Sequence, residues 1–337
     1  MSPQQQAVIL PSVKAPFVVG PRDIPLPEEG GVLIRIMSTA LNPANWKQRE
    51  YDVFIPRYPV VLGCDIAGVV EAIGSGVEGF KKGDKVFAST IVGGFQQYIT
   101  LSAAMLISMP ENASFDEAAT FPCAFNTACV GLFAPSPIGI GLNPTFSWDK
   151  PRQGDSALVI GASTSVGQFA IQLLKFCGFI RIVAYASKAH FDYLRELGAT
   201  ECIDRTEVPL DSVATQISAP VNVVYDAFTG ALNAAYDCLV DGGSIVTVLP
   251  EAMAKILRPR SDTQRPPTAV CCGAGAHNVR ELIIKNLPEM MAKGAVTPNR
   301  CEVLPHGLAG ISGGLERMQK GGVSGVKLVA HPHDPMA

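Results

Sequence analysis

The chain has 337 residues, which is more than one compact domain usually holds, so we expect two domains. Hydrophobic residues make up 47% of it and charged residues 17%, a composition that excludes general disorder. The 27 Lys and Arg nearly balance the 30 Asp and Glu, giving a net charge of −3. This balance argues against nucleic acid as a partner, because binding phosphates needs a basic surface.

Residues 118–148 form a long stretch without Asp, Glu, Lys or Arg. Its four prolines and two asparagines would interrupt a membrane-spanning helix, so we expect a buried, folded segment and no membrane association. The N-terminus lacks a basic region followed by a long apolar run, so we expect no signal peptide and a cytoplasmic location. The nine cysteines include no CxxC pair, which favours reduced thiols over a disulfide framework.

The first part of the chain is predicted to be rich in β-strands. Short apolar runs, separated by frequent glycines as in a barrel-like sheet, lie at 32–37, 66–73, 85–87 and 97–100. Farther along, Ser114 and Glu117 have the spacing of a capping box and predict the start of a helix. A second helix is expected at 126–133, and the Pro-, Gly- and Asn-rich residues 134–151 are interpreted as an insertion or a lid.

From residue 156 onward, predicted strands and helices alternate. Apolar strands are expected at 156–160, 181–185, 221–225, 244–249 and 268–272. Helices are expected at 165–177 and 190–197. This alternation predicts a parallel, doubly wound sheet. The tail no longer follows this regular alternation: a helix is expected at 279–293 and short strands at 302–304 and 326–330.

The sharpest local signal is LVIGASTSVGQFAIQLLK, residues 158–175. It predicts a strand, a glycine-rich turn and a helix, although it is not a GxGxxG motif. Gly161 suits a tight turn, Gly167 a close approach of helix and strand, and the helix N-terminus a pyrophosphate. With the alternating elements that follow, the turn predicts a dinucleotide site. Its residues are Gly161, Ala162, Ser163, Thr164, Ser165, Val166 and Gly167.

The end of the second strand indicates which dinucleotide binds. NAD sites usually place Asp or Glu there, to hold the ribose 2′-hydroxyl. This chain has Ser187 and Lys188 instead, with no acid before Asp192. A hydroxyl and a cation suit a 2′-phosphate, so NADPH is the expected cofactor. Lys188 is alternatively an ordinary solvated residue at a helix start.

Three further segments complete a family resemblance: LNPANWK (41–47), YPVVLGCDIAGVVEAIGSGVEGFKKGDKVFA (58–88) and GGFQQYI (93–99). With them the chain resembles the medium-chain dehydrogenase/reductase superfamily over nearly its whole length. It is most similar to the zinc-free, quinone-oxidoreductase-like branch and, within it, to fungal trans-acting enoyl reductases of polyketide synthases. The resemblance implies an α/β chain with a GroES-like, β-barrel-type catalytic domain, residues 1–123 and 279–337. A Rossmann NADP(H)-binding domain, residues 124–278, is inserted in it.

The resemblance also bears on metal binding. Zinc-dependent relatives hold a catalytic zinc on a Cys, a His-Glu pair and a later Cys or Asp. Here the His-Glu position reads Cys64-Asp65, and Asn45 is the nearest polar residue to the position of the first Cys. Zinc needs three or four convergent ligands, so we expect no metal and interpret Cys64 and Asp65 as a packed thiol beside a hydrogen-bonded carboxylate. Without a Lewis acid, alcohol oxidation is disfavoured.

The resemblance suggests catalytic roles for two residues. Lys47, in NPANWK, would lie against the cofactor, and Tyr51, in the following loop, would donate a proton. A packed loop tyrosine is the alternative interpretation of Tyr51, and Tyr58 or solvent water could also supply the proton.

The resemblance extends to the cofactor site. Thr127 would contact the nicotinamide end, or else be a helix-interior threonine bonded to a carbonyl. Arg205 would bind the 2′-phosphate, or else be an ordinary exposed arginine. Lys327 would close over the cofactor from the tail. The remaining candidates are Asp226, at the end of a central strand, and Val248 and Leu249 beside the nicotinamide.

These features predict an NADPH-dependent reductase that transfers hydride to the β-carbon of an activated carbon–carbon double bond. The expected substrate is a 2-enoyl thioester polyketide intermediate, either small or bound to a carrier, with a polyketide synthase as a possible partner. The uncharged residues 118–148 would help to line its acyl pocket. Two alternatives stay open: a quinone or 2-alkenal reductase with a small diffusible substrate, and a non-catalytic NADPH-binding protein.

Overall fold

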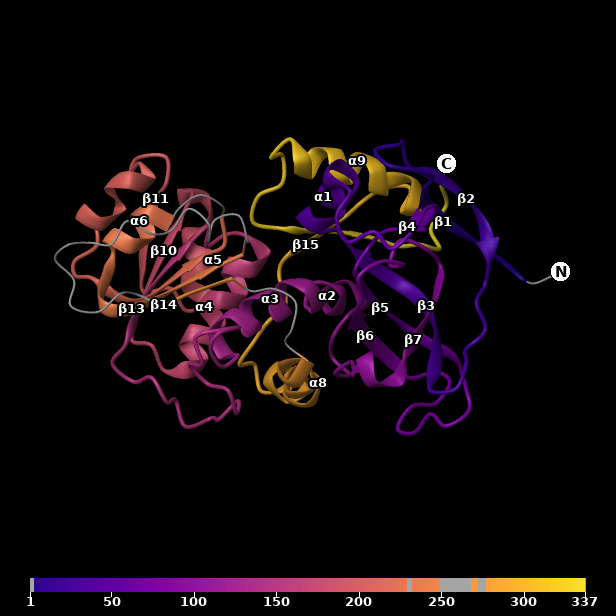
Figure 1. Cartoon of the computed structure of the whole chain (residues 1–337), viewed down its shortest axis with the longest axis horizontal. Coiled ribbons are helices and arrows are strands. Elements are labelled where there is room, and N and C mark those ends of the chain that lie inside the picture. Colours follow the sequence, from indigo (N-terminus) through magenta and orange to yellow (C-terminus); the bar gives the residue numbers. More distant parts are fainter. Residues whose placement is uncertain (1–2, 229–231, 249–267, 272–276, 337) are drawn as a thin grey trace. The chain divides into compact units, whose positions relative to one another are not determined.

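The computed structural model describes residues 3–228, 232–248, 268–271 and 277–336 (Figure 1). The chain divides into two compact units. The first unit combines Met1–Cys123 with Pro298–Ala337, and the second comprises Ala124–Thr297. The division after Cys123 coincides with the predicted one, whereas the return to the first unit comes after Thr297 and not after residue 278.

The first unit is built on β-sheets, as predicted. A small sheet has the order β2 (Val18–Asp23), β1 (Gln4–Leu10), β4 (Val60–Val61). The larger sheet runs β15 (Cys301–Val303), β16 (Lys327–Ala330), β3 (Gly31–Ala40), β5 (Asp65–Ile73), β6 (Lys85–Ser89), β8 (Ile107–Ser108), with β7 (Tyr98–Ser102) also paired to β3. Strand β16 comes from the tail and pairs with β3, so the two chain segments of this unit share one sheet.

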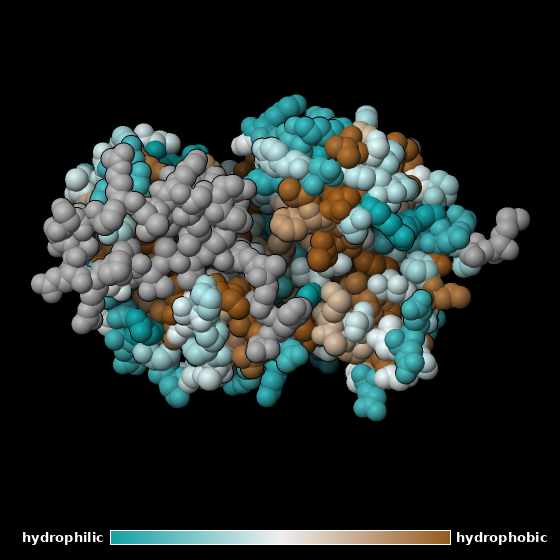
Figure 2. Space-filling model, in the orientation of Figure 1, coloured by the Kyte–Doolittle hydropathy of each residue, from teal (hydrophilic) through white to brown (hydrophobic). Residues whose placement is uncertain are grey.

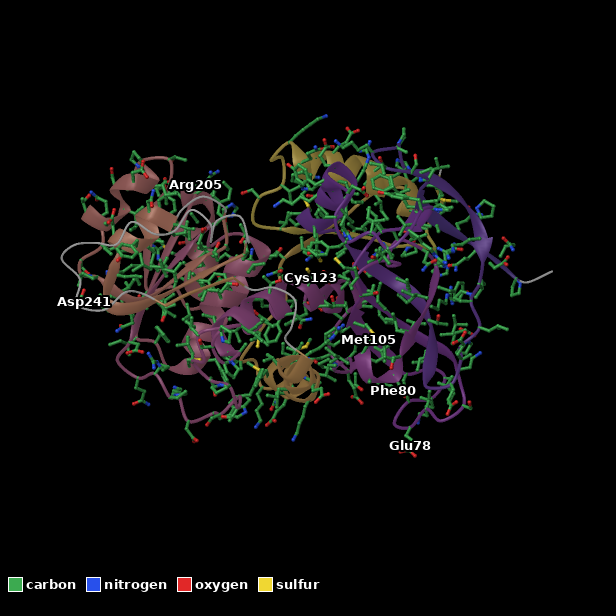
Figure 3. All side chains as sticks on the ribbon, in the orientation of Figure 1. Glu78, Phe80, Met105, Cys123, Arg205 and Asp241 are labelled. Carbon is green, nitrogen blue, oxygen red and sulfur yellow. The ribbon has the colours of Figure 1, made fainter. Side chains whose placement is uncertain are left out.

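Apolar side chains on the inner faces of these strands form the core. One cluster includes the fully buried Ile34, Ile66 and Val86, and Phe80 and Met105 pack against it (Figure 3). A second cluster joins the small sheet to the tail and includes Leu10, Leu62, Leu308 and Leu328.

Helices and 3-10 turns complete the first unit. They are α1 (Pro43–Tyr51), η1 (Ala103–Met105), α2 (Phe115–Ala119), η4 (Gly307–Ala309) and α9 (Gly310–Gln319). The predicted capping box at the start of α2 is confirmed, because Ser114 Oγ accepts from the Glu117 amide and the Glu117 carboxylate accepts from the Ser114 amide. On the face drawn in Figure 2, hydrophobic residues gather across the middle of this unit, between polar residues above and below.

The second unit contains the predicted parallel sheet. Within the described residues its strand order is β11 (Glu201–Asp204), β10 (Arg181–Ala186), β9 (Ser156–Ile160), β12 (Val221–Asp226), β13 (Leu239–Thr247), β14 (Thr268–Cys271). The accompanying helices are α3 (Pro122–Phe133), α4 (Ser165–Cys177), η2 (Lys188–His190), α5 (Phe191–Leu197), η3 (Leu210–Thr215), α6 (Leu232–Asp237) and α8 (His277–Ala292). The order reverses between β9 and β12, and right-handed crossovers on either side of that point place α4 and α6 on opposite faces of the sheet.

Helix α8 ends within the second unit, which explains the shifted boundary. The Gln172 side chain of α4 accepts from the Thr297 amide, 2.7 Å away, and donates to the Thr297 carbonyl, 3.2 Å away. These two bonds hold the chain beside α4 until residue 297, so the helix predicted at 279–293 belongs with the nucleotide-binding unit.

The long uncharged segment is part of the molecule's own packing. The Phe146 ring lies edge-on to Phe133 at 5.2 Å between centroids, and Trp148 lies edge-on to Phe176 at 5.0 Å. Phe121, Phe125, Phe133 and Phe146 are each at most 3% exposed. Phe146 and Trp148 therefore pack against other parts of the second unit, and the buried rings of this segment belong to the protein's core. Its predicted part in an acyl pocket stays a prediction. None of the helices in the described ranges combines the length and apolar character that crossing a membrane requires.

The segment after β16 is fastened to the first unit by His331. Its Nε2 lies 2.8 Å from Asp116 Oδ1, and its Nδ1 lies 3.2 Å from Asp334 Oδ2. Burial lowers the pKa of His331, but the two carboxylates outweigh burial and raise this pKa above its ordinary value of 6.5.

We expect His331→Asn to cost more stability at low pH than at high pH. A histidine whose pKa rises on folding stabilises the protein fully below its unfolded pKa, and this contribution is lost as the pH rises through the folded pKa. Urea unfolding of both proteins at about pH 6 and about pH 8 measures the difference. An equal loss of stability at the two pH values would contradict this prediction.

Candidate functional site

The glycine-rich turn between β9 and α4 has the open backbone that the sequence predicted. Gly161 has φ +71°, and a Cβ there would lie 2.9 Å from Phe228 Cβ. A Cβ on Gly167 would lie 2.4 Å from the Gly161 carbonyl oxygen and 2.8 Å from Ala162 Cα. Both positions therefore require glycine, and the helix approaches the strand as closely as a dinucleotide turn needs.

The turn and the first residues of α4 provide donors for an anion. Thr164 is the N-cap, and its Oγ1 accepts from the Gly167 amide at 3.0 Å, so this hydroxyl serves the helix. The Ser163 carbonyl accepts from Gln168 Nε2 at 2.9 Å, which fixes the turn. Ser163, Ser165 and Val166 are half-buried. The first amides of a helix and its dipole favour a phosphate at this end.

Gly167→Ala is expected to lower the free energy of unfolding by about 1–3 kcal/mol, the usual cost of forcing a group into a packed space. The matched control is Gly313→Ala, since a Cβ at this exposed helical glycine meets no atom within 4 Å. Urea denaturation of both variants measures the two costs. Equal stabilities of the two variants would contradict this prediction, because they would show that α4 can move away from the turn without loss of stability.

The strand register brings the predicted 2′-phosphate residues together. Ala186 of β10 pairs with Asp204 of β11, so the residues that follow them, Ser187 and Arg205, are neighbours. Arg205 Nε donates to Ser187 Oγ at 2.6 Å. Lys188 and Arg205 are exposed, and Figure 3 marks Arg205 in the second unit.

The nearest carboxylate is engaged elsewhere. Asp204 Oδ1 accepts from the amide and the hydroxyl of Thr206, at 2.9 Å and 2.8 Å. These bonds, with smaller effects from Lys188, lower the pKa of Asp204. Two exposed cations and a half-buried hydroxyl thus lie at the end of β10, which is the chemistry that a phosphate monoester requires.

Other predicted cofactor residues lie at the same edge of the sheet. Ile160 pairs with Asp226, and Asp226 pairs with Thr247, so Gly161 and Val248 follow the two strands that flank β12. Asp226 is fully buried, and its Oδ1 accepts from the Phe228 amide at 2.9 Å. Leu249 lies outside the described residues.

Thr127 is positioned by helix α3. Tyr225 Oη, from β12, donates to the Thr127 carbonyl at 3.2 Å, which ties α3 to the sheet. The Thr127 side chain is half-buried. Its predicted contact with the nicotinamide stays a prediction.

In the first unit, the predicted catalytic residues share one helix. Lys47 and Tyr51 are four residues apart on α1 and lie on one face of it. Lys47 Nζ lies 5.7 Å from the centre of the Trp46 ring, and the Tyr51 ring lies 6.2 Å from it. Tyr51 is 62% exposed, so its hydroxyl is accessible.

The start of α1 is tied to a buried ion pair. Asp65 and Lys327 are 0% and 3% exposed, and Lys327 Nζ lies 3.1 Å from Asp65 Oδ2. Asn42 precedes α1; its Nδ2 donates to Asp65 Oδ2 at 2.8 Å, and its Oδ1 accepts from Lys327 Nζ at 2.6 Å. Asp65 Oδ1 accepts from the Cys123 amide at 2.8 Å, at the start of α3. Asp65 thus joins two helices and the tail strand β16.

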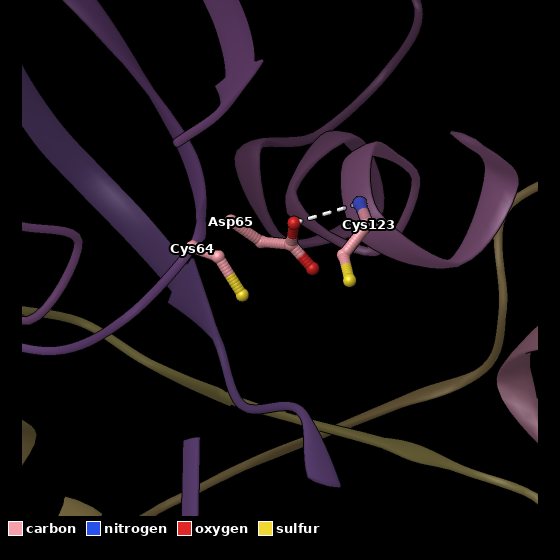
Figure 4. Close-up of side chains that lie close together, drawn as sticks. All are labelled: Cys64, Asp65 and Cys123. Atoms are coloured by element: carbon pink, nitrogen blue, oxygen red, sulfur yellow. Dashed lines mark hydrogen bonds between the residues drawn. The ribbon is translucent and has the colours of Figure 1, made fainter. Parts of the chain in front are cut away.

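Two thiols lie beside this carboxylate. Figure 4 shows the sulfur atoms of Cys64 and Cys123 on either side of Asp65. The hydrogen bond with Cys123 and burial raise the pKa of Cys64 well above its ordinary value. Burial raises the pKa of Asp65, and Lys327, Asn42 and the Cys123 amide oppose this shift without cancelling it. A buried thiol with a raised pKa is a poor nucleophile, so Cys64 does not suit covalent catalysis.

The chain is similar to known dehydrogenases and reductases in both of its units. Models of the alcohol dehydrogenase GroES-like domain and of the zinc-binding dehydrogenase match residues 28–111 and 165–261. Trans-enoyl reductase tazE of Aspergillus terreus is 39% identical over 217 residues, which cover 60% of this chain and 69% of that protein. The chain belongs to the medium-chain dehydrogenase/reductase family. It is therefore an oxidoreductase enzyme, and the family implies a nicotinamide cofactor.

One further similar sequence and one similar solved structure agree with this family assignment. Trans-enoyl reductase tndF of Aspergillus flavipes is 40% identical over 215 residues, and the match spans 60% of that protein's length. An alcohol dehydrogenase superfamily protein from Novosphingobium aromaticivorans superimposes with a TM-score of 0.77 at 25% identity. That superposition covers 94% of this chain and 95% of the other. The predicted combination of a GroES-like domain and a Rossmann domain is confirmed.

The description of one matching family names zinc, so we asked whether side chains in the first unit could ligate a zinc ion. Ligand atoms of Cys64, Asp65 and Cys123 lie within 4.8 Å of one another, so Cys123 adds a candidate ligand that sequence reasoning missed. Both Asp65 oxygens, however, already accept from nitrogen donors, one of them the Lys327 ammonium. Without Asp65, Cys64 and Cys123 are two ligands, fewer than the three or four that zinc takes, so these residues do not fit a resident zinc ion.

Proposed function

We propose that this enzyme is an NADPH-dependent reductase of activated carbon–carbon double bonds. Its preferred substrate would be a 2-enoyl thioester polyketide intermediate presented by a carrier protein of a polyketide synthase. The similarity to proteins named trans-enoyl reductases supports the reaction. The group of Ser187, Lys188 and Arg205 supports NADPH over NADH as the cofactor. It offers two cations to the ribose 2′-position, and the carboxylate of Asp204 beside it is bonded to Thr206.

The chemistry asks little of the protein beyond binding and positioning. In an enoyl thioester the β-carbon is already electrophilic, and bound NADPH would supply the hydride that it accepts. The protein must hold the double bond in place, stabilise the negative charge on the thioester oxygen and deliver a proton to the α-carbon. The backbone amides at the start of α4, with Ser187, Lys188 and Arg205, would hold the phosphates of the cofactor.

The proton at the α-carbon is assigned to Tyr51 Oη. Tyr51 was expected in a loop but is the last residue of α1, whereas Tyr58 lies beyond the helix and donates its hydroxyl to Asp52 Oδ1 at 2.7 Å. Burial, together with that bond and the Asp52 charge, raises the pKa of Tyr58 to about 12. Tyr58 is thereby a weaker acid whose proton is already engaged, whereas Tyr51 is exposed on the same helix as Lys47. Lys47 would hold the cofactor or the developing oxyanion by charge.

The first experiment follows NADPH absorbance with two substrates in parallel, a short 2-enoyl pantetheine thioester and an ortho-quinone. Turnover of the thioester with little on the quinone is the expected result. Turnover of the quinone alone would overturn the proposal and place the enzyme among small-molecule reductases. If neither reacts while NADPH binds, the same enoyl group is offered on a carrier protein. Failure there too would favour a non-catalytic role.

Ser187→Asp is expected to lower kcat/KM for NADPH by roughly 10–150-fold, the value of a charge-assisted hydrogen bond. The new carboxylate would repel the 2′-phosphate and pair with Arg205. Rates with NADH should change little, because its 2′-hydroxyl can donate to a carboxylate. Ser187→Ala is the matched control, since it removes the hydroxyl without adding charge. Equal losses with both cofactors would contradict the assignment of the 2′-phosphate.

A further inference from the structure

Both oxygens of the Asp65 carboxylate already have partners within the protein. Its Oδ1 accepts from the Cys123 amide at 2.8 Å, and its Oδ2 accepts from Asn42 Nδ2 at 2.8 Å and lies 3.1 Å from Lys327 Nζ. Carboxylate and ammonium are 0% and 3% exposed, so the two charges neutralise each other out of contact with water. An ion pair in this environment needs hydrogen bonds from its surroundings, and here Asn42 and the Cys123 amide provide them.

The thiol of Cys64 is also surrounded by nitrogen donors. Asn42 Nδ2 lies 3.3 Å and Asn45 Nδ2 lies 3.6 Å from Cys64 Sγ. The position that the family resemblance assigns to a first zinc ligand is thus occupied by amide groups that donate toward sulfur. A metal bound to Cys64 would have to displace these donors.

We propose that the Lys327 ammonium is the resident cation of this site, and that it excludes divalent zinc. A zinc ion that shares Asp65 with Lys327 would stand within a few ångströms of the ammonium, where like charges repel strongly in a buried setting. Without Asp65, Cys64 and Cys123 are two ligands, which is fewer than a structural or catalytic zinc requires. The proposal concerns the buried core of the first unit and holds whatever the substrate of the enzyme.

The ammonium also has a positioning role through Asn42. Lys327 Nζ donates to Asn42 Oδ1 at 2.6 Å, and the Asn42 amide donates to Asn45 Oδ1 at 2.9 Å. The tail strand β16 thereby fixes the residue from which α1 begins. A metal ion has no hydrogen to donate to Asn42 Oδ1. An ammonium group can make this bond, and a zinc ion cannot.

The test begins with the unaltered full chain. The protein is incubated with excess Zn²⁺, or with Co²⁺ as a spectroscopic probe, then desalted, and its metal content is measured. We expect no stoichiometric metal and no thiolate-to-cobalt absorption. One equivalent of zinc that survives desalting and disappears in Cys64→Ser and Cys123→Ser would overturn the proposal. This arm does not depend on how any Lys327 variant folds.

The second arm removes the ammonium. In Lys327→Met the Asp65 carboxylate loses its cation and becomes available to a metal beside the two thiols. We expect Zn²⁺ to bind at least about 10-fold more tightly than in the unaltered protein and to raise the melting temperature of the variant alone. Cys64→Ser in the same background should abolish the shift. Lys82→Met, at a side chain that is 72% exposed, is the matched control and should show no zinc response.

Lys327→Arg distinguishes exclusion by charge from a purely structural role. It keeps a buried cation that donates hydrogen bonds, so it should restore resistance to zinc even if it packs less well. A folded Lys327→Met that stays indifferent to zinc would contradict the proposal, as would a Lys327→Arg that binds zinc as well as Lys327→Met does.

Discussion

Replacing Asp65 by alanine is expected to lower the free energy of unfolding by about 3–5 kcal/mol. The substitution leaves the Lys327 ammonium buried without its counter-charge, and it removes the acceptor of the Cys123 amide and of Asn42 Nδ2. The loss should exceed that of an ordinary core truncation, because a charge is left uncompensated. Urea unfolding, followed by circular dichroism, measures it.

The matched control for Asp65 is Glu71→Ala. Glu71 also pairs with a lysine, Lys82, but these side chains are 38% and 72% exposed. Solvent screens such a pair, so its loss should cost only about 0–1 kcal/mol. Comparable losses in the two variants would show that the Asp65 pair is worth no more than a surface contact, and would remove the anchor that we assign to α1.

Tyr51→Phe is expected to lower kcat for the 2-enoyl thioester by about 100-fold or more, the usual contribution of a positioned general acid. The variant removes only the hydroxyl, which is accessible in the structure because the side chain is 62% exposed. Binding of NADPH should be unchanged. Stopped-flow turnover together with a fluorescence titration of NADPH separates the two quantities.

Tyr58→Phe provides the comparison for Tyr51. It removes a hydroxyl that is bonded to Asp52 and whose pKa is raised to about 12, so its effect on kcat should be small. A Tyr51→Phe enzyme with the full rate would contradict the assignment and would leave the proton to solvent. If Tyr58→Phe gave the larger loss instead, the roles of the two tyrosines would be reversed.

Where local chemistry decides the structure, sequence reasoning succeeded. Helix α4 begins at Ser165 and ends at Cys177, as predicted, because Thr164 caps it and Gly178 adopts a left-handed conformation at its end. The glycine turn and the capping box of α2 follow from residues close together in the chain. Two of the predicted cofactor residues, Ser187 and Arg205, are 18 residues apart and are brought side by side by the parallel pairing of β10 and β11.

Where distant residues decide the structure, sequence reasoning failed. Helix α9 was not expected, because its glycines argue against a helix; Gly314 lets the helix pack closely there, since a Cβ would lie 2.7 Å from Leu304 Cδ1. Strand β13 begins at Leu239, earlier than the predicted apolar run, because pairing with β12 extends it through a polar stretch. Cys123 and Asn42 join Asp65 from other elements, and no local motif links the three.

The register of β10 against β11 has a consequence for how cofactor preference can change. Ser187 and Arg205 meet only because Ala186 stands opposite Asp204. Everything between them, including α5, is a closed loop that can be exchanged or resized without moving either side chain, provided that its two ends stay in phase. A slip of one residue would instead turn Arg205 to the other face of the sheet and leave Ser187 alone. The proposed coenzyme preference would therefore depend on the alignment of two strands as much as on the identity of two residues, and a change of loop length would alter it only where it shifts that alignment.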